Sequence, residues 1–122
     1  MHELSIATSI VRTVLDEMAQ RNLPCVDKIG LKVGVLTDVV PEALLFNFEA
    51  ITKETPLADS ELEIEHIPLE AGCRKCDHRF EVVDLAFACP RCRSGQVEVI
   101  RGEELDIAYL EVPDDGDEGN VD

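Results

Sequence analysis

Four cysteines in two close pairs are the residues of this sequence best suited to hold a metal ion. The pairs are Cys73-Arg74-Lys75-Cys76 and Cys89-Pro90-Arg91-Cys92, with twelve residues between them. Two Cys-x-x-Cys pairs can bring four thiolates to the corners of a tetrahedron, which is the geometry of a closed structural zinc site. The gap is slightly shorter than the usual ~15 to 20 residues but still allows a compact hairpin. We therefore expect zinc, or a similar tetrahedral metal, at Cys73, Cys76, Cys89 and Cys92.

Two other kinds of chemistry use cysteines in pairs. Two disulfides would require an oxidising compartment, which nothing else in the sequence suggests. The second pair also resembles the iron-binding turn of a rubredoxin, but Arg93 stands where a rubredoxin has glycine, and the segment lacks the aromatic residues that pack around that iron. A filled four-thiolate site has no open coordination position, which favours a structural role over the activation of water.

The remaining cysteine and two of the three histidines are weaker candidates for chemistry. Cys25 lies between the first helix and the first strand, where a small buried hydrophobe is its default role. His66 shares a strand face with Leu62 and Ile64, so we expect a packed histidine and not a metal ligand. His78 lies inside the cysteine segment, but four thiols already complete a tetrahedral shell.

The third histidine differs because of its position in the chain. His2 places its imidazole, its own amide nitrogen and the terminal amine of Met1 within reach of one cation, and the amide of Glu3 can supply a fourth nitrogen. Four nitrogens in a plane suit Ni(II) or Cu(II). A helix N-terminus opposes a cation, so residues 1–3 are expected outside the helix. Most second-position histidines are frayed terminal residues, so composition alone does not assign this site.

Charge and hydropathy narrow the classes of function. The 122-residue chain has a formal charge of −15, and residues 113–122 carry five acids and no base. This charge repels phosphate backbones and argues against nucleic-acid binding, although many zinc ribbons bind nucleic acid. No apolar run approaches the ~20 residues that span a membrane, and the N-terminus lacks the basic and apolar regions of a signal peptide. We expect a cytoplasmic protein with reduced cysteines.

Hydrophobic periodicity predicts the elements that position these residues. Helical spacing predicts one helix over residues 4–21 and a second that begins at Pro41 and ends before Pro56. Alternation predicts long strands at 28–35, 61–67 and 104–112, and apolar residues along 80–87 predict the short strands of a ribbon.

The order of these elements predicts an α+β fold, with two helices on a three-stranded sheet and an inserted four-cysteine zinc-ribbon module. The strands at 61–67 and 104–112 flank the insert, so we expect them to be neighbours in the sheet. Residues 1–67 together with 103–112 would form the α+β domain, and residues 68–102 the zinc-ribbon domain. Residues 113–122 would be a disordered acidic tail because they have too little apolar surface to order themselves.

Several short motifs are spread from Met1 to about Val112. They are Met1-His2-Glu3, Gly34-Val35-Leu36, Pro41-Glu42-Ala43-Leu44, Phe48-Glu49, the two cysteine pairs and Gly102-Glu103-Glu104-Leu105. Together they resemble the HypA/HybF family of nickel metallochaperones, which serve the maturation of [NiFe]-hydrogenase and, in some organisms, of urease. Thr37-Asp38 stands in place of a frequent Ser-Gly, and Arg93-Ser94-Gly95 in place of a frequent Gly-Ser. Neither departure removes a ligand.

The resemblance implies a nickel carrier that is not an enzyme. It implies Ni(II) as transferred cargo, bound in the α+β domain by His2 with the backbone nitrogens of Met1, His2 and Glu3, and structural Zn(II) at the four cysteines. It also implies two partners, a nickel-handling GTPase of the same pathway and the hydrogenase large-subunit precursor, with neither nucleic acid nor a membrane as a partner. A monomer and a homodimer both stay open. The alternatives are a zinc-ribbon adaptor for nucleic acid or transcription machinery, which the charge disfavours, and an iron electron carrier.

Overall fold

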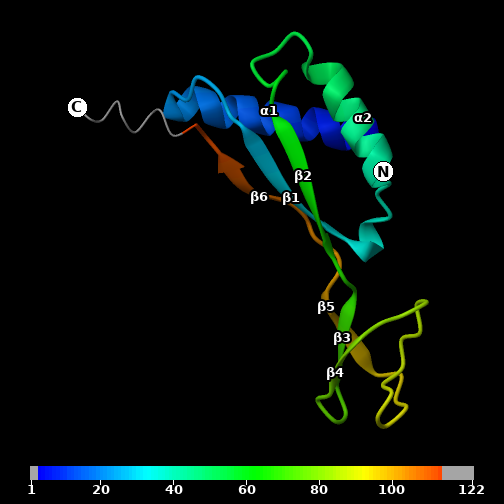
Figure 1. Ribbon diagram of the computed structural model, residues 1–122. Coiled ribbons are helices and arrows are strands. Elements are labelled where there is room, and N and C mark those ends of the chain that lie inside the picture. The colour runs from blue at the N-terminus through cyan, green and yellow to red at the C-terminus, as the bar shows by residue number, and fades with distance from the viewer. Residues whose placement is uncertain (1–2, 114–122) are drawn as a thin grey trace. The chain divides into compact units, whose positions relative to one another are not determined.

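The computed structural model of the protein describes residues 3–113, so Met1, His2 and the predicted tail from residue 114 lie outside the described residues. Figure 1 shows the helices and strands in chain order. They are α1 (Glu3–Arg21), β1 (Lys28–Gly34), the short 3-10 helix η1 (Val35–Thr37), α2 (Pro41–Thr52), β2 (Glu61–Ile67), β3 (Glu70–Cys73), β4 (Arg79–Glu81), β5 (Val97–Arg101) and β6 (Leu105–Glu111). The predicted α+β fold with two helices and a four-cysteine module is confirmed.

The chain divides into two compact units. The first unit comprises Met1–Leu31, Val39–Ile64 and Ile107–Asp122, and the second comprises Lys32–Asp38 and Glu65–Asp106. Three of these limits fall inside β1, β2 and β6, and the fourth, between Asp38 and Val39, lies in the loop between η1 and α2. The domain limits drawn from the sequence stay a prediction. Within residues 3–113, no helix is both long and apolar enough to cross a membrane.

In the first unit, α1 forms where the sequence predicts a helix and packs against α2. Its buried stripe repeats at helical spacing and consists of Ile6, Ala7, Ile10, Val11, Val14 and Met18. The helix ends because Asn22 adopts a left-handed conformation (φ 56°) and the N–H of Leu23 donates to the Met18 carbonyl at 2.9 Å. This is the Schellman arrangement that commonly ends a helix. Pro41, whose fixed φ suits the first helical turn, begins α2.

The larger sheet has the strand order β2-β1-β6, so the expectation that the strands at 61–67 and 104–112 are neighbours is wrong. The central strand is the most apolar one, because Ile29, Leu31 and Val33 of β1 are buried. Acidic residues recur along both outer strands, and like charges directly opposite each other destabilise a sheet. With β1 between them, its Lys28 instead pairs with Glu63 of β2 at 3.9 Å.

The smaller sheet, with the order β4-β3-β5, carries the cysteines. Its core contains Leu69, Ala71 and Val82, with three partly buried side chains against them. The periodicity of residues 80–87 predicts continued strand structure, but β4 ends at Glu81. The reason is a tight turn, in which the N–H of Ala86 donates to the Val83 carbonyl at 3.1 Å. The neighbouring short strands β3 and β5 were not predicted individually.

Candidate metal centre

The four cysteine sulfurs gather at one end of the smaller sheet. The Sγ atoms of Cys73, Cys76, Cys89 and Cys92 all lie within 4.8 Å of one another. Two of the separations are 3.5 Å, between Cys73 and Cys92, and 3.6 Å, between Cys76 and Cys89. A tetrahedron with metal–sulfur bonds of about 2.3 Å has edges of roughly 3.8 Å. The donor set therefore fits a tetrahedral metal ion with only small adjustments.

The first cysteine pair forms a turn whose backbone donates to sulfur. The N–H groups of Lys75 and Cys76 lie 3.3 and 3.4 Å from Cys73 Sγ. The chain then reverses through Asp77, which has a left-handed backbone (φ 64°) and whose N–H donates to the Cys73 carbonyl at 2.9 Å. The N–H of Cys73 in turn donates to the His78 carbonyl at 2.8 Å. Backbone donors aimed at a sulfur stabilise its thiolate form.

The second pair repeats this turn almost bond for bond. The N–H groups of Arg91 and Cys92 lie 3.4 and 3.5 Å from Cys89 Sγ. Arg93 has a left-handed backbone (φ 65°) and donates to the Cys89 carbonyl at 2.7 Å. The N–H of Cys89 donates to the Ser94 carbonyl at 2.9 Å. Arg93 thus leaves the turn intact, but it occupies a left-handed backbone position that glycine would adopt without strain.

These hydrogen bonds give the thiols different pKa values. At Cys89, burial opposes ionisation, but the N–H groups of Cys92 and Arg91 and the neighbouring thiols outweigh it and lower the pKa to about 6. The N–H of Cys76 is the largest influence on Cys73 and lowers the pKa of that thiol as well. At Cys76 a backbone hydrogen bond favours the thiolate, yet burial and three nearby thiols raise the pKa to about 12. Without a metal the cluster shares protons, which a divalent cation would displace.

The other candidates in the described part of the chain lie away from this cluster. Cys25 is exposed, so the expectation that it is a buried hydrophobe is wrong. His66 is exposed and Ile67 is buried, so the expectation of a packed histidine is wrong. The alternation of buried and exposed residues in β2 shifts by one position near the end of the strand, and the local sequence pattern does not predict this shift. The ring of His78 stacks on Phe80 at a centroid distance of 6.0 Å, and within residues 3–113 only the four cysteines form the ligand group.

Two residues of the predicted nickel site, Met1 and His2, lie outside the described residues, and Glu3 is the first residue of α1. The expectation that residue 3 stays outside the helix is therefore wrong. The first N–H groups of a helix take no part in its internal hydrogen bonds, so a helical start does not consume this amide. The carboxylate Oε2 of Glu3 accepts a hydrogen bond of 2.9 Å from the N–H of Val40, the N-cap residue of α2. Sequence reasoning missed this contact because 37 residues separate its partners.

Comparison with known proteins gives consistent matches along the chain. Residues 1–112 match the family described as HypA, hydrogenase/urease nickel incorporation, metallochaperone. The hydrogenase maturation factor HypA of Desulfatibacillum aliphaticivorans is 40% identical over 120 residues, covering 93% of this chain and 88% of that protein. The factor of the same name from Desulfosudis oleivorans is 41% identical over 113 residues, covering 92% of this chain and 98% of that protein.

Two solved structures share the fold. The solution structure of the Ni metallochaperone HypA from Helicobacter pylori matches with a TM-score of 0.64 and 22% identity, over 92% of this chain and 97% of that chain. A second solution structure, of a HypA protein, matches with a TM-score of 0.71 and 23% identity, over 93% of this chain and 97% of that chain.

Proposed function

Because this chain belongs to the HypA family, the nickel metallochaperones of hydrogenase maturation, we propose that it binds Ni(II) at its N-terminus and delivers it during maturation of [NiFe]-hydrogenase. As a member it is a maturation factor and not an enzyme. The observation that carries the proposal is the family match, which begins at Met1 and so includes the terminal Met-His-Glu. The family description also names urease, which we keep as a second acceptor to be tested.

In the proposed nickel site the donors are the amine of Met1, the imidazole and amide of His2, and the amide of Glu3. Four nitrogens in one plane suit Ni(II). The contact between Glu3 and Val40 supports this assignment because it holds residue 3, and with it the amide nitrogen offered to the ion, in a fixed place. The two amides bind only when deprotonated, so reprotonation in an acceptor complex offers a simple means of releasing the ion.

We propose that the four cysteines hold Zn(II) in a structural role. Zinc would supply a tetrahedral crosslink between the two turns, and four protein ligands would leave it no open position. Two N–H donors on each of Cys73 and Cys89 offset the negative charge of the thiolates. Iron would accept the same tetrahedron, and a visible spectrum of the purified protein separates the two, because four-thiolate iron is coloured and zinc is colourless.

We further propose that the carrier works in the cytoplasm, where thiols stay reduced. Its partners would be a nickel-handling GTPase of the same pathway and the hydrogenase large-subunit precursor. A carrier needs such partners because its own site must pass the ion on and not retain it. The zinc-ribbon adaptor for nucleic acid is not favoured, and salt-sensitive binding to nucleic acid would be its signature.

The proposal is tested by titrating the untagged full-length chain with nickel and recording optical and X-ray absorption spectra. His2→Ala should remove the tight site, since the imidazole is lost. Acetylation of the Met1 amine keeps every side chain but removes the amine as a donor, so it should weaken binding as well. If both variants bind nickel like the parent chain, the N-terminal site is wrong.

A further inference from the structure

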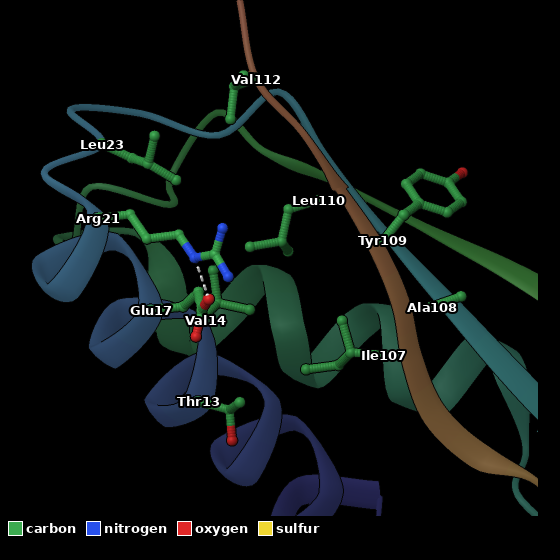
Figure 2. Close-up of a pocket in the computed structure, with 10 residues that line it drawn as sticks. All are labelled: Thr13, Val14, Glu17, Arg21, Leu23, Ile107, Ala108, Tyr109, Leu110 and Val112. Atoms are coloured by element: carbon green, nitrogen blue, oxygen red, sulfur yellow. Dashed lines mark hydrogen bonds and ion pairs between the residues drawn. The ribbon is translucent and has the colours of Figure 1, made fainter.

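A groove in the first unit has no occupant among the described residues of the chain. Figure 2 shows it between α1 and β6. Its volume is about 530 Å³. Its lining is mainly aliphatic, with Val14 and Leu23 on one side and Ile107, Leu110 and Val112 on the other. Tyr109 points away from α1, as Figure 2 shows. The groove therefore offers apolar surface that the first unit itself does not cover.

The groove also carries a charged margin. Glu17 and Arg21, four residues apart on α1, form an ion pair at its edge, and Arg21 is the only basic residue that lines it. The side chain of Arg21 is 69% exposed. An exposed pair of this kind contributes little to stability and leaves its members accessible to other charges.

A second feature, in the second unit, has the complementary character. Residues 83–87, which we call the apolar loop, expose three large hydrophobic side chains, with Val83 at 62%, Leu85 at 63% and Phe87 at 38%. Asp84 and Leu85 both have φ of 56° and occupy the centre of the turn. A left-handed backbone is unusual and unfavourable for a bulky residue such as leucine. The chain therefore holds Leu85 on the surface in spite of this backbone strain.

We propose that the apolar loop of one copy of this chain inserts into the α1–β6 groove of a second copy. The same contact made in reverse closes a twofold dimer, in which each copy supplies one loop and one groove. Leu85 is the anchor, since it is the most exposed apolar residue of the loop. Asp84, the loop's only acid, is matched by Arg21, the groove's only base. Apolar contact at the centre with charge pairing at the rim is the usual composition of an interface.

The distribution of charge favours this pairing of unlike parts. The second unit carries seven basic and ten acidic side chains, a formal charge of −3, and the first unit carries four basic and sixteen acidic side chains, a formal charge of −12. Two first units repel each other strongly, whereas a loop on the weakly charged second unit meets less repulsion as it approaches the first unit of a second copy. At physiological salt, repulsion between more distant charges is screened over about 8 Å.

The test measures the monomer–dimer equilibrium of the untagged, metal-loaded full chain by sedimentation equilibrium. Leu85→Asn keeps a residue that tolerates the left-handed turn but removes the apolar anchor. If each contact weakens about tenfold, the dimer dissociation constant rises about a hundredfold, because the contact occurs twice. Phe46→Asn is the matched control, since Phe46 is 70% exposed on α2 and belongs to neither the loop nor the groove. It should leave the constant unchanged.

A mixing experiment separates a specific contact from general stickiness. Thr13→Glu adds an acid to the exposed α1 face of the groove, where it would repel Asp84 of the loop, and should also weaken the dimer. A copy with Leu85→Asn still has a groove, and a copy with Thr13→Glu still has a loop, so the mixed dimer has one intact contact and one contact that carries both changes. A contact already weakened by one change loses less from the second, so the mixture should dimerise more tightly than either variant alone. A chain that stays monomeric at all concentrations would overturn the proposal. So would a dimer that responds equally to Leu85→Asn and Phe46→Asn, or a mixture no tighter than its components.

Discussion

The ring of Tyr109 lies directly against the backbone of Gly30 in the neighbouring strand. A Cβ atom added to Gly30 would lie 2.1 Å from Tyr109 Cε2, and the Tyr109 hydroxyl donates a hydrogen bond to Glu63. One side chain thus crosses from β6 over β1 to β2, and the absence of a side chain at residue 30 makes this crossing possible. Gly30, one of the glycines that alternate along the first strand, therefore has a packing role.

Gly30→Ala is therefore expected to displace Tyr109 and destabilise the protein by about 1–3 kcal/mol, the usual cost of overpacking. Thermal unfolding followed by circular dichroism measures the loss, and the fluorescence of this single tyrosine reports its displacement. Gly95→Ala is the control, because a Cβ there meets nothing within 4 Å. Equal melting temperatures for the two variants would contradict the close packing of Gly30 and Tyr109.

Glu3→Ala should loosen the start of α1 because the Val40 N–H loses its carboxylate partner. A hydrogen bond to a charged group contributes about 1.5–3 kcal/mol, and this one, at an exposed position, belongs at or below the lower end. We expect faster hydrogen exchange at the Val40 amide and weaker nickel binding, since the terminus is less fixed. Glu42→Ala is the matched control for Glu3→Ala. It also removes one carboxylate, from the first turn of α2, but leaves the hydrogen bond between Glu3 and Val40 in place. Identical exchange rates at Val40 in both variants would count against the anchor.

Arg93→Gly should stabilise the second cysteine turn. Glycine relieves the left-handed strain of roughly 1–2 kcal/mol but loses about 0.5–1 kcal/mol through the entropy of the unfolded chain, for a net gain of about 0–1.5 kcal/mol. Thermal unfolding of the metal-loaded protein measures the change. Arg91→Gly, two residues earlier and not at positive φ, should destabilise, since it adds only the entropy cost. A lower melting temperature for Arg93→Gly would refute the strain at this position.

Zinc affinity is expected to fall steeply once the pH drops below about 6. The pKa of Cys89 is lowered to about 6, so above that pH its thiolate is already formed and metal binding displaces no proton there. Below it the proton must leave first, and each further pH unit costs up to tenfold in affinity from this thiol alone. Cys76, whose pKa is raised to about 12, must release its proton at every accessible pH. Competition with a chromophoric chelator between pH 5 and 8 measures the slope, and a slope unchanged across pH 6 would contradict the assignment.

Features that depend on neighbours in sequence were predictable from the sequence. The first helix was predicted over residues 4–21 and is observed at Glu3–Arg21, and the strand at 61–67 coincides with β2. Both predictions depend on the spacing of apolar residues, because the geometry of a helix or a strand determines which spacing places these residues on one face. The two cysteine turns were predictable for the same reason, since a two-residue spacing within each pair favours a tight turn, and the meeting of the four sulfurs was expected from the tetrahedral geometry of a bound metal.

Tertiary structure decided which elements meet and which side chains are covered. It placed β1 between two acidic strands, left Cys25 and His66 exposed, and brought Glu3 to Val40 across 37 residues. It also turned residues 83–87 outward, although their composition suits a strand. The physical reason is that periodicity describes only one element at a time. Burial, charge separation between strands and long-range hydrogen bonds depend on the surface that each element finds opposite it.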